Sequence, residues 1–247
     1  ESLAELLLFE SSNQRPGAQI SLKDYSSRMQ AGQRDIYYLC APSRELAESS
    51  PYFEAFKEKS LEVLFCYESY DELTLMQLNQ YDRKQLTSVE THVHQDKSSD
   101  TASGSEAKEG KEKHDGVSKD DSAKIVDWIK STMGNKVFEV KLSNKLTSYP
   151  CMITVDHMGA ARHFVRTELT SLSDDQRYLL LRPTLEVNLS HPIMVKLNSL
   201  RDSDAETATL LLEQVYDNAL VAAGLMDNPR TMVARLNNLL TKMVEKA

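Results

Sequence analysis

Residues 1–91 alternate between helical and extended hydrophobic patterns. Ser21 and Asp24 stand three positions apart in front of a hydrophobic run, which is the spacing of a capping box. We therefore predict a helix that passes through Tyr25 and Met29 and ends near Gly32. The chain start at Glu1 also enters directly into a helical pattern, and we expect further protein upstream of it.

Short apolar runs between the predicted helices are typical of buried strands. Ser50 before Pro51 and Ser69 before Glu72 predict the starts of two more helices. The strands are expected at residues 35–41, 61–66 and 85–89. Helices that alternate with buried strands favour a parallel sheet covered on both faces. The pattern thus predicts an α/β fold for residues 1–91, a small three-layer αβα domain with a short parallel sheet.

The pattern stops at residues 92–120, where Ser, Gly, Lys, Glu and Asp dominate. Val93 and Val117 are the only aliphatic side chains larger than Ala in this stretch. Such a segment buries too little apolar area to offset the conformational entropy lost on folding. We therefore predict a flexible charged linker between two domains.

A second domain is predicted over residues 121–247, mixed α/β at first and helical at its end. Ser118 and Asp121 favour the start of a helix whose apolar face carries Trp128. Strands are expected at residues 136–142, 152–155 and 183–187. The architecture overall is therefore α+β, with an α/β first domain.

The pattern of residues 203–247 predicts two long amphipathic helices. Ser203 and Glu206 form a capping box, Gly224 suits a helix C-terminus, and Asn228 with Pro229 starts the last helix. The apolar face of the last helix is wider than one neighbouring helix would cover. We expect the two helices to pair with those of a second copy in a four-helix arrangement, unless the same domain covers them. The expected dimerisation residues are Leu212, Val215, Tyr216, Ala219, Met232, Leu236, Leu239, Leu240 and Met243.

The segment from Met158 to Phe164 mixes large apolar side chains with basic ones. Exposed Met and Phe side chains suit adaptable contact with apolar surfaces of other proteins, so Met158, Ala160 and Phe164 are candidate contact residues. The alternative is that Met158 and Phe164 pack beneath a loop.

Composition narrows the classes of partner. The net charge of -8, without a local Lys and Arg cluster, disfavours nucleic acid and anionic lipid as partners. With 40% hydrophobic and 27% charged residues and only short apolar runs, the sequence predicts a soluble globular chain. Three widely spaced cysteines, Cys40, Cys66 and Cys151, are expected to be reduced core thiols.

No catalytic motif stands out in the sequence. It contains no Gly-x-Gly-x-x-Gly, no phosphate-binding Gly-x-x-x-x-Gly-Lys, no Gly-x-Ser-x-Gly and no His-Glu-x-x-His. His92 and His94 lie at the linker edge without organised Cys or carboxylate neighbours, which disfavours a metal site. Asp71 and Glu72 begin a helix, where carboxylates favour the positive end of the dipole. We therefore assign no catalytic, cofactor-binding or metal-ligating residue.

Several of these segments together resemble a known family. The matching segments of the first domain are 21–29, 36–38, 50–56, 62–65 and 71–72, which resemble the small lobe of the middle domain of heat shock protein 90 chaperones. Residues 183–188 and the helices around 211–225 and 228–240 resemble that family's C-terminal dimerisation domain. Residues 38–42 and 158–164 look most like the mitochondrial branch of the family.

The resemblance implies a non-catalytic part of an ATP-dependent chaperone. ATP and Mg would bind in an N-terminal domain upstream of Glu1, and this region would supply client-protein contact and constitutive homodimerisation. The resemblance also implies the mitochondrial matrix. Because the sequence ends at Ala247 without the tail of the cytosolic relatives, we expect no binding of tetratricopeptide co-chaperones. Two alternatives stay open: a purely structural dimerisation module without client binding, and an α/β enzyme domain that binds a cofactor at the carboxyl ends of its strands.

Overall fold

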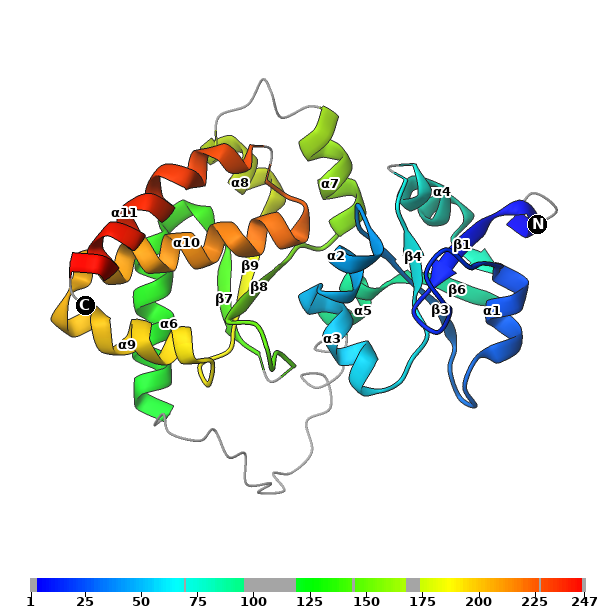
Figure 1. The fold of residues 1–247 in the computed structure, drawn as a ribbon, viewed down its shortest axis with the longest axis horizontal. Coiled ribbons are helices and arrows are strands. Elements are labelled where there is room, and N and C mark those ends of the chain that lie inside the picture. The colour runs from blue at the N-terminus through cyan, green and yellow to red at the C-terminus, as the bar shows by residue number, and fades with distance from the viewer. Residues whose placement is uncertain are drawn as a thin grey trace. The chain divides into compact units, whose positions relative to one another are not determined.

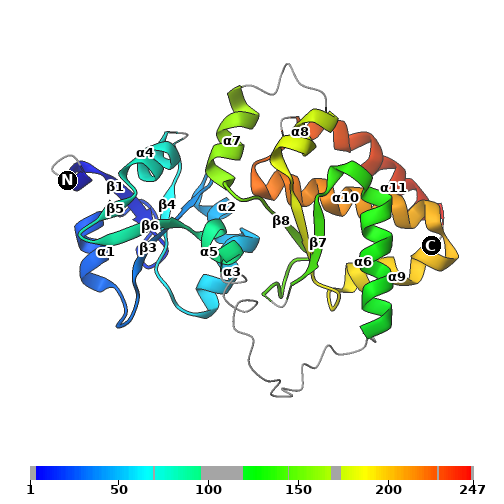
Figure 2. The ribbon, with the colours of Figure 1, turned by 180° about the vertical axis from the view of Figure 1, so that it is seen from behind.

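A computed structural model describes residues 4–68, 70–95, 119–143, 145–167, 174–226 and 228–245. These residues form two compact units, each with its own sheet (Figures 1 and 2). Unit 1 holds the described residues up to Gln95 together with 156–160, and unit 2 holds the rest. The fold is the mixed α/β class that the sequence predicts.

Unit 1 is built on a six-stranded sheet in the order β2-β1-β4-β3-β6-β5. The strands are β1 (Leu8–Ser11), β2 (Gln19–Ser21), β3 (Asp35–Cys40), β4 (Leu64–Cys66), β5 (Gln80–Tyr81) and β6 (Lys84–Ser88). The predicted strands β4, β3 and β6 are parallel and lie at the centre. The sheet is mixed rather than parallel throughout, because β1, β2 and β5 add antiparallel pairs.

Helices cover both faces of this sheet, as predicted. They are α1 (Leu22–Arg28), α2 (Arg44–Glu48), α3 (Pro51–Glu58), α4 (Asp71–Leu78) and α5 (Val89–Gln95), with a 3-10 turn η1 (Ala4–Leu6) at the start. Ile36 and Tyr38 of β3 share a buried cluster with Tyr25 of α1 and Leu75 of α4. Tyr37, which points to the opposite face, packs its ring against Phe56 of α3 at a centroid distance of 4.8 Å.

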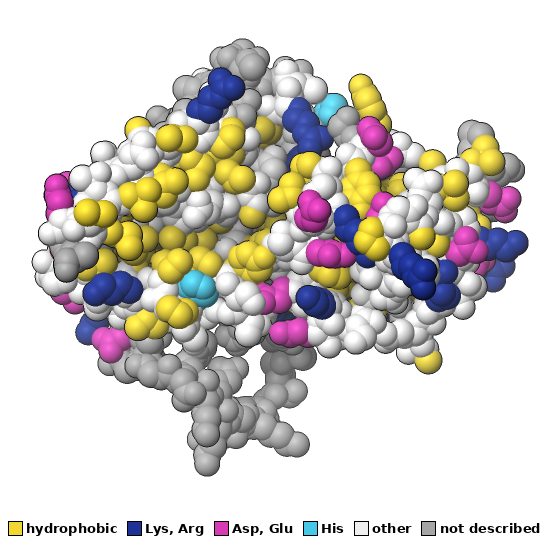
Figure 3. Space-filling view, viewed as in Figure 1, with side chains coloured by type: hydrophobic (Ala, Val, Ile, Leu, Met, Phe, Trp, Pro, Cys, Tyr) yellow, Lys and Arg dark blue, Asp and Glu magenta, His cyan; other side chains and the backbone are white. Residues whose placement is uncertain are grey.

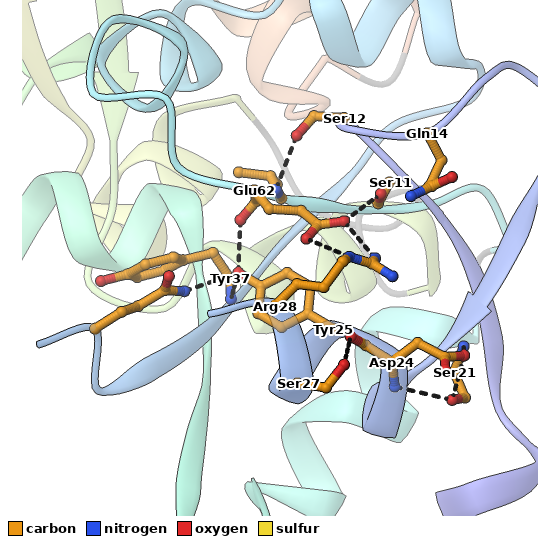
Figure 4. Close-up of polar contacts among 12 residues, drawn as sticks. Ser11, Ser12, Gln14, Ser21, Asp24, Tyr25, Ser27, Arg28, Tyr37 and Glu62 are labelled. Carbon is orange, nitrogen blue, oxygen red and sulfur yellow. Dashed lines mark hydrogen bonds and ion pairs between the residues drawn. The ribbon is translucent and has the colours of Figure 1, made fainter. Parts of the chain in front are cut away.

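A polar network fastens α1 to the strand that begins at Leu64 (Figure 4). Arg28 Nη2 lies 2.7 Å from Glu62 Oε1, and Ser11 Oγ donates to the same oxygen at 2.6 Å. Tyr25 Oη donates to the Glu62 carbonyl at 2.5 Å and accepts from the Tyr37 backbone N–H at 3.2 Å. Each buried polar group named here therefore has a partner, which avoids the cost of burying it alone.

Two helix starts in unit 1 confirm the capping predictions. Ser21 accepts from the Asp24 backbone N–H while the Asp24 side chain accepts from Ser21, and Ser50 caps α3 ahead of Pro51. The start of α4 differs, because its N-cap residue is Tyr70 and makes no side-chain hydrogen bond. Ser69 and Ser118, the other predicted caps, lie outside the described residues.

Unit 2 has a three-stranded sheet in the order β7-β9-β8. Its strands β7 (Glu139–Leu142), β8 (Cys151–Thr154) and β9 (Thr184–Val187) match the three predicted ones. Its helical elements are α6 (Lys119–Met133), η2 (Gly134–Lys136), α8 (Asp174–Leu181), α9 (Pro192–Ser203), α10 (Ala205–Ala223), η4 (Pro229–Met232) and α11 (Val233–Glu245). Helix α7 (Met158–Thr167) has its first three residues in unit 1 and the others in unit 2.

Helix α10 is the centre of unit 2, where it packs on β8, α9 and α11 (Figure 1). Its N-cap is Asp204, which accepts from the Thr207 backbone N–H, whereas the sequence predicts Ser203. Ser203 instead ends α9 and donates its hydroxyl to the Ser199 carbonyl at 3.0 Å. The last helix begins as predicted at Asn228, first as the 3-10 turn η4 and then as α11.

Two further predictions concern the linker and the cysteines. Residues 92–95 belong to α5 and residues 119–120 to α6, and the rest of the predicted linker lies outside the described residues. All three cysteines are free thiols; Cys66 and Cys151 are buried and Cys40 is half-buried.

Candidate functional site

Helix α11 and the η4 turn before it have an inner and an outer face that differ in their surroundings. The inner face is formed by residues at positions 232, 235, 239 and 242, all buried or half-buried. The outer face is formed by five exposed side chains, namely Val233, Leu236, Leu240, Met243 and Val244. A helix that packs against a single neighbour needs only one apolar stripe, so the outer face is in excess of what α11 uses within the chain.

Ion pairs fix the inner face of α11 to α10. Arg235 Nε lies 3.2 Å from Glu213 Oε2, and its Nη1 pairs with Asp217. Lys242 Nζ lies 2.7 Å from Glu206 Oε1, one helical turn beyond the buried Leu239. The acidic partners on α10 follow one another at seven and four residues, so they form one stripe along α10.

Asp217 is the most buried acid of this set. Burial raises the pKa of Asp217 above its ordinary value, and the neighbouring Arg235 and Lys136 cations offset part of that rise. Lys136 also lies 3.1 Å from Glu213, and its carbonyl accepts from Tyr216 Oη at 2.7 Å. The inner face is therefore held by a connected polar network as well as by Leu239, and α11 has a defined orientation on α10.

The dimerisation residues predicted on α10 are buried within the chain, unlike most of those predicted after α10. Leu212, Val215, Tyr216 and Ala219 are all buried within the chain, against the sheet and neighbouring helices. Cys151 of β8 shows how close this packing is, because its Sγ lies 3.6 Å from the Val215 carbonyl and burial raises its pKa to about 12. These four α10 side chains thus form the core beneath α11 and have no surface left for a partner.

Of the dimerisation residues predicted on α11, Leu236, Leu240 and Met243 lie on the exposed outer face. Met232 is half-buried and Leu239 is buried, both on the inner face. Hydrophobic side chains gather over α11 in the space-filling view (Figure 3). Val221, near the end of α10, is also exposed. The sequence pattern did not predict it as a dimerisation residue, because the residues that follow it are small and Val221 is not part of a recognisable apolar stripe.

Helix α7 carries the predicted contact residues, which the structure distributes over different faces. Met158 is 1% exposed and shares a buried face with Ala161 and Val165. Phe164 is half-buried and Ala160 is exposed. The segment is a strongly amphipathic helix, so spacing of three and seven residues turns Met158 inward instead of presenting it beside Phe164.

The start of α7 is closely packed within unit 1. A Cβ atom at Gly159 would lie 2.7 Å from Met76 Sδ and 2.9 Å from Glu72 Oε1. Glu72 lies in the first turn of α4, as the sequence predicts, and its side chain is buried there. A larger side chain at position 159 would require both neighbours to shift.

The described residues show no metal site and no membrane-spanning helix. No group of three or more His, Cys, Asp and Glu side chains is placed there to hold a metal ion. None of the described helices combines the length and apolarity needed to cross a bilayer.

The sequence matches the family model described as "Hsp90 protein" over residues 1–247. The chain belongs to the Hsp90 family. Its small αβα unit and its helical C-terminal unit are thus those of an Hsp90-family protein, as the resemblance of individual segments predicts.

Curated relatives place the chain within the Hsp90 family. It is 47% identical to "Heat shock protein 75 kDa, mitochondrial" of Rattus norvegicus, over all of this chain and 34% of the relative. It is 33% identical to "TNF receptor-associated protein 1 homolog, mitochondrial" of Dictyostelium discoideum, over all of this chain and 33% of the relative. "Chaperone protein HtpG" of Desulfitobacterium hafniense is 35% identical over 98% of this chain and 38% of the relative. The chain thus spans about a third of the length of these relatives.

Proposed function

We propose that this chain is the client-contacting and dimerising region of an ATP-dependent chaperone of the Hsp90 family, in mitochondria. Family membership and the names of the relatives support the chaperone role and the location. ATP binding and hydrolysis are assigned to the part of the relatives' length that this chain does not span. The chain itself then acts by binding other proteins and a second copy of itself.

The outer face of α11 carries the dimerisation part of the proposal. Its five exposed apolar side chains lie on a helix whose inner face already packs on α10 through Leu239 and through ion pairs. Contiguous apolar surface of this kind is costly in water and marks protein contacts. Residues 233, 236, 240 and 243 follow the alternating three-and-four spacing of helices that pack at a shallow angle.

A second copy of the chain fits this face best. Two copies related by a twofold axis would pair their α11 outer faces, with Val221 and the exposed Ala222 of α10 at the edge. The four helices α10 and α11 of the two copies would then form a bundle, in which each outer stripe is covered by its equivalent. The buried α10 residues support this bundle from within each copy.

The client-contact part of the proposal rests on α7. Phe164 keeps part of its ring accessible, and the exposed Ala160 lies one turn before it on the same helix. A partly exposed aromatic ring on a small-residue helix suits transient contact with apolar segments of unfolded chains. Met158 supports the helix from its buried face instead of making the contact.

The dimerisation proposal is tested by sedimentation equilibrium with a matched pair of variants. Leu240 and Val195 are both 51% exposed and both lie on helices of unit 2, but only Leu240 is on the α11 outer face. Leu240→Glu places two uncompensated charges in a twofold interface and is expected to weaken the dimer at least about tenfold. Val195→Glu is expected to leave the mass of the wild-type dimer unchanged. Equal masses for all three proteins would contradict the proposed interface.

Client contact is tested by the suppression of light scattering from dithiothreitol-reduced insulin. Phe164→Ser removes the aromatic ring from α7, and we expect it to lower the suppression by about two- to tenfold per mole of chain. His163→Ser, a change at the exposed neighbouring position, is the control and should behave as the wild type. Full suppression by Phe164→Ser together with an intact dimer would instead favour a purely structural dimerisation module.

A further inference from the structure

The turn at the end of α10 determines where α11 begins. Helix α10 ends at Ala223, and Gly224 adopts a left-handed conformation with φ of 68°. The backbone N–H of Leu225 then donates to the Leu220 carbonyl at 2.9 Å, which closes the helix end. Every residue of η4 and α11 follows this turn, so its geometry sets the direction of the dimerisation helix.

A buried arginine from α7 lies at this turn. Arg162 is 4% exposed, and its Nη1 donates to the Ala223 carbonyl at 3.3 Å. The carbonyls of the last helical turn have no partner within the helix and carry the negative end of the helix dipole. A guanidinium is well suited to that end, because it adds a positive charge and a hydrogen-bond donor together.

The aliphatic part of Arg162 also contacts the turn. A Cβ atom at position 224 would lie 3.1 Å from Arg162 Cδ and 3.7 Å from its Cγ. Glycine is therefore required at position 224 both for its positive φ and for the close approach of the arginine stem. Arg162 thus covers the turn with its stem and binds the end of α10 with its head group.

Arg166, the other arginine of α7, has a different environment. Arg166 is exposed, one turn beyond Arg162, while Arg162 shares the buried face with Ala161 and Val165. Burial of an arginine head group is costly unless it is hydrogen-bonded, and long charged side chains are rarely buried without a specific role. The position of Arg162 at a helix end provides such a role.

We propose that Arg162 is the positioning residue that fixes the α10–α11 corner, so that α7 sets the orientation of the α11 outer face. The inference rests on the proposed function, because the outer face is the surface that pairs with the second copy. Loss of Arg162 leaves the core of unit 2 in place but allows the Gly224 turn to open. The predicted consequence is a weaker dimer without a change at the interface itself.

The test compares Arg162→Met with Arg166→Met in the whole chain. Methionine keeps much of the apolar stem and removes the charged head group. We expect Arg162→Met to raise the dimer dissociation constant about tenfold, as for loss of one charge-assisted hydrogen bond at a helix end. Amide hydrogen exchange at Gly224 and Leu225 should accelerate by a similar factor, while exchange in β8 and β9 stays as in the wild type. Arg166→Met should change neither quantity.

The outcomes separate this inference from the proposed function. A monomeric wild type would contradict the dimer, and exchange at Gly224 and Leu225 would still report whether Arg162 holds the turn. A wild-type dissociation constant and wild-type exchange in Arg162→Met would overturn the inference and leave the dimer standing. If Arg162→Met does not fold, Arg162→Lys is measured instead, and partial recovery of both quantities is expected because the charge remains. Failure of both variants to fold would assign Arg162 to the general stability of unit 2 and overturn the proposal.

Discussion

At the scale of single residues, the side chains that matter most are polar groups buried with defined partners. Tyr25 in unit 1 is an example, since its hydroxyl donates to the Glu62 carbonyl and accepts from both Tyr37 N–H and the Gln33 side chain. Tyr→Phe at this position would leave a buried backbone N–H and a buried carbonyl without that partner. Arg162 in unit 2 follows the same principle at a helix end.

We predict that Tyr25→Phe lowers the free energy of unfolding of unit 1 by about 1–3 kcal/mol, the usual cost of orphaned buried hydrogen-bonding groups. Urea unfolding checks this as a lower midpoint with an unchanged slope. Tyr70→Phe is the control, because Tyr70 is 74% exposed and its substitution should leave the midpoint unchanged.

The same variant tests a pH dependence. Burial raises the pKa of Tyr25 to about 12, above its ordinary value of 10.0, although the bonds from Tyr37 and Gln33 lower it in part. A group whose pKa is raised on folding contributes stability below its unfolded pKa, and that contribution is lost as the pH rises through the folded value. Wild-type stability should therefore fall between about pH 10 and 12 more steeply than that of Tyr25→Phe. Parallel curves for the two proteins would contradict the assignment.

At the scale of elements, sequence signals locate helix ends best where one residue type alone fits the geometry. Gly224, Ser21 and the Ser50–Pro51 pair mark their helix ends correctly, because each satisfies a specific backbone requirement. Ser203 and Asp204 are both good N-cap residues, so the pattern alone does not choose between them. The choice falls to Asp204 because the Ser203 hydroxyl is bonded to the last turn of α9.

The short antiparallel strands of the unit 1 sheet are the elements that the pattern misses. Strands β1, β2 and β5 have two to four residues each, too few for a period of two to stand out. The apolar residues before β1 also suit a helix, and the strand forms because it pairs with both β2 and β4. Tertiary pairing overrides local propensity there.

The apolar stripes of α10 and α11 show what the pattern does and does not determine. Both stripes are visible in the sequence, and they predict that either a second copy or the same domain covers these helices. Which neighbour covers them depends on the fold: β8, α9 and α11 cover α10, whereas α11 keeps a free outer face. The same limit applies to α7, where helical periodicity turns Met158 inward. Arg162 and Arg235 escaped sequence reasoning because their partners lie far along the chain, at Ala223 in one case and Glu213 in the other.

At the scale of the whole molecule, each of the two units has its own sheet and its own buried core. The outer face of α11 belongs to unit 2, as does Trp128, the single tryptophan of the chain, which is half-buried on α6. Tyr25 and its network belong to unit 1. Unfolding of the two units can therefore be followed separately, by tryptophan fluorescence for unit 2 and by the effect of Tyr25→Phe for unit 1.

A dimer formed through α11 makes the stability of unit 2 depend on protein concentration. Association removes folded monomer from the unfolding equilibrium, so each tenfold rise in concentration should add about 1.4 kcal/mol per mole of dimer at 25 °C. We predict that the Trp128 unfolding midpoint in urea rises with concentration, whereas the transition sensitive to Tyr25→Phe does not. Leu240→Glu should remove the concentration dependence, and Val195→Glu should keep it. A Trp128 midpoint that is constant from micromolar to hundredfold higher concentration would mean that the outer face of α11 does not hold two copies together. A dependence that survives Leu240→Glu would place the contact on another surface of unit 2, because the substitution charges the centre of the α11 outer face and changes no residue of its inner face.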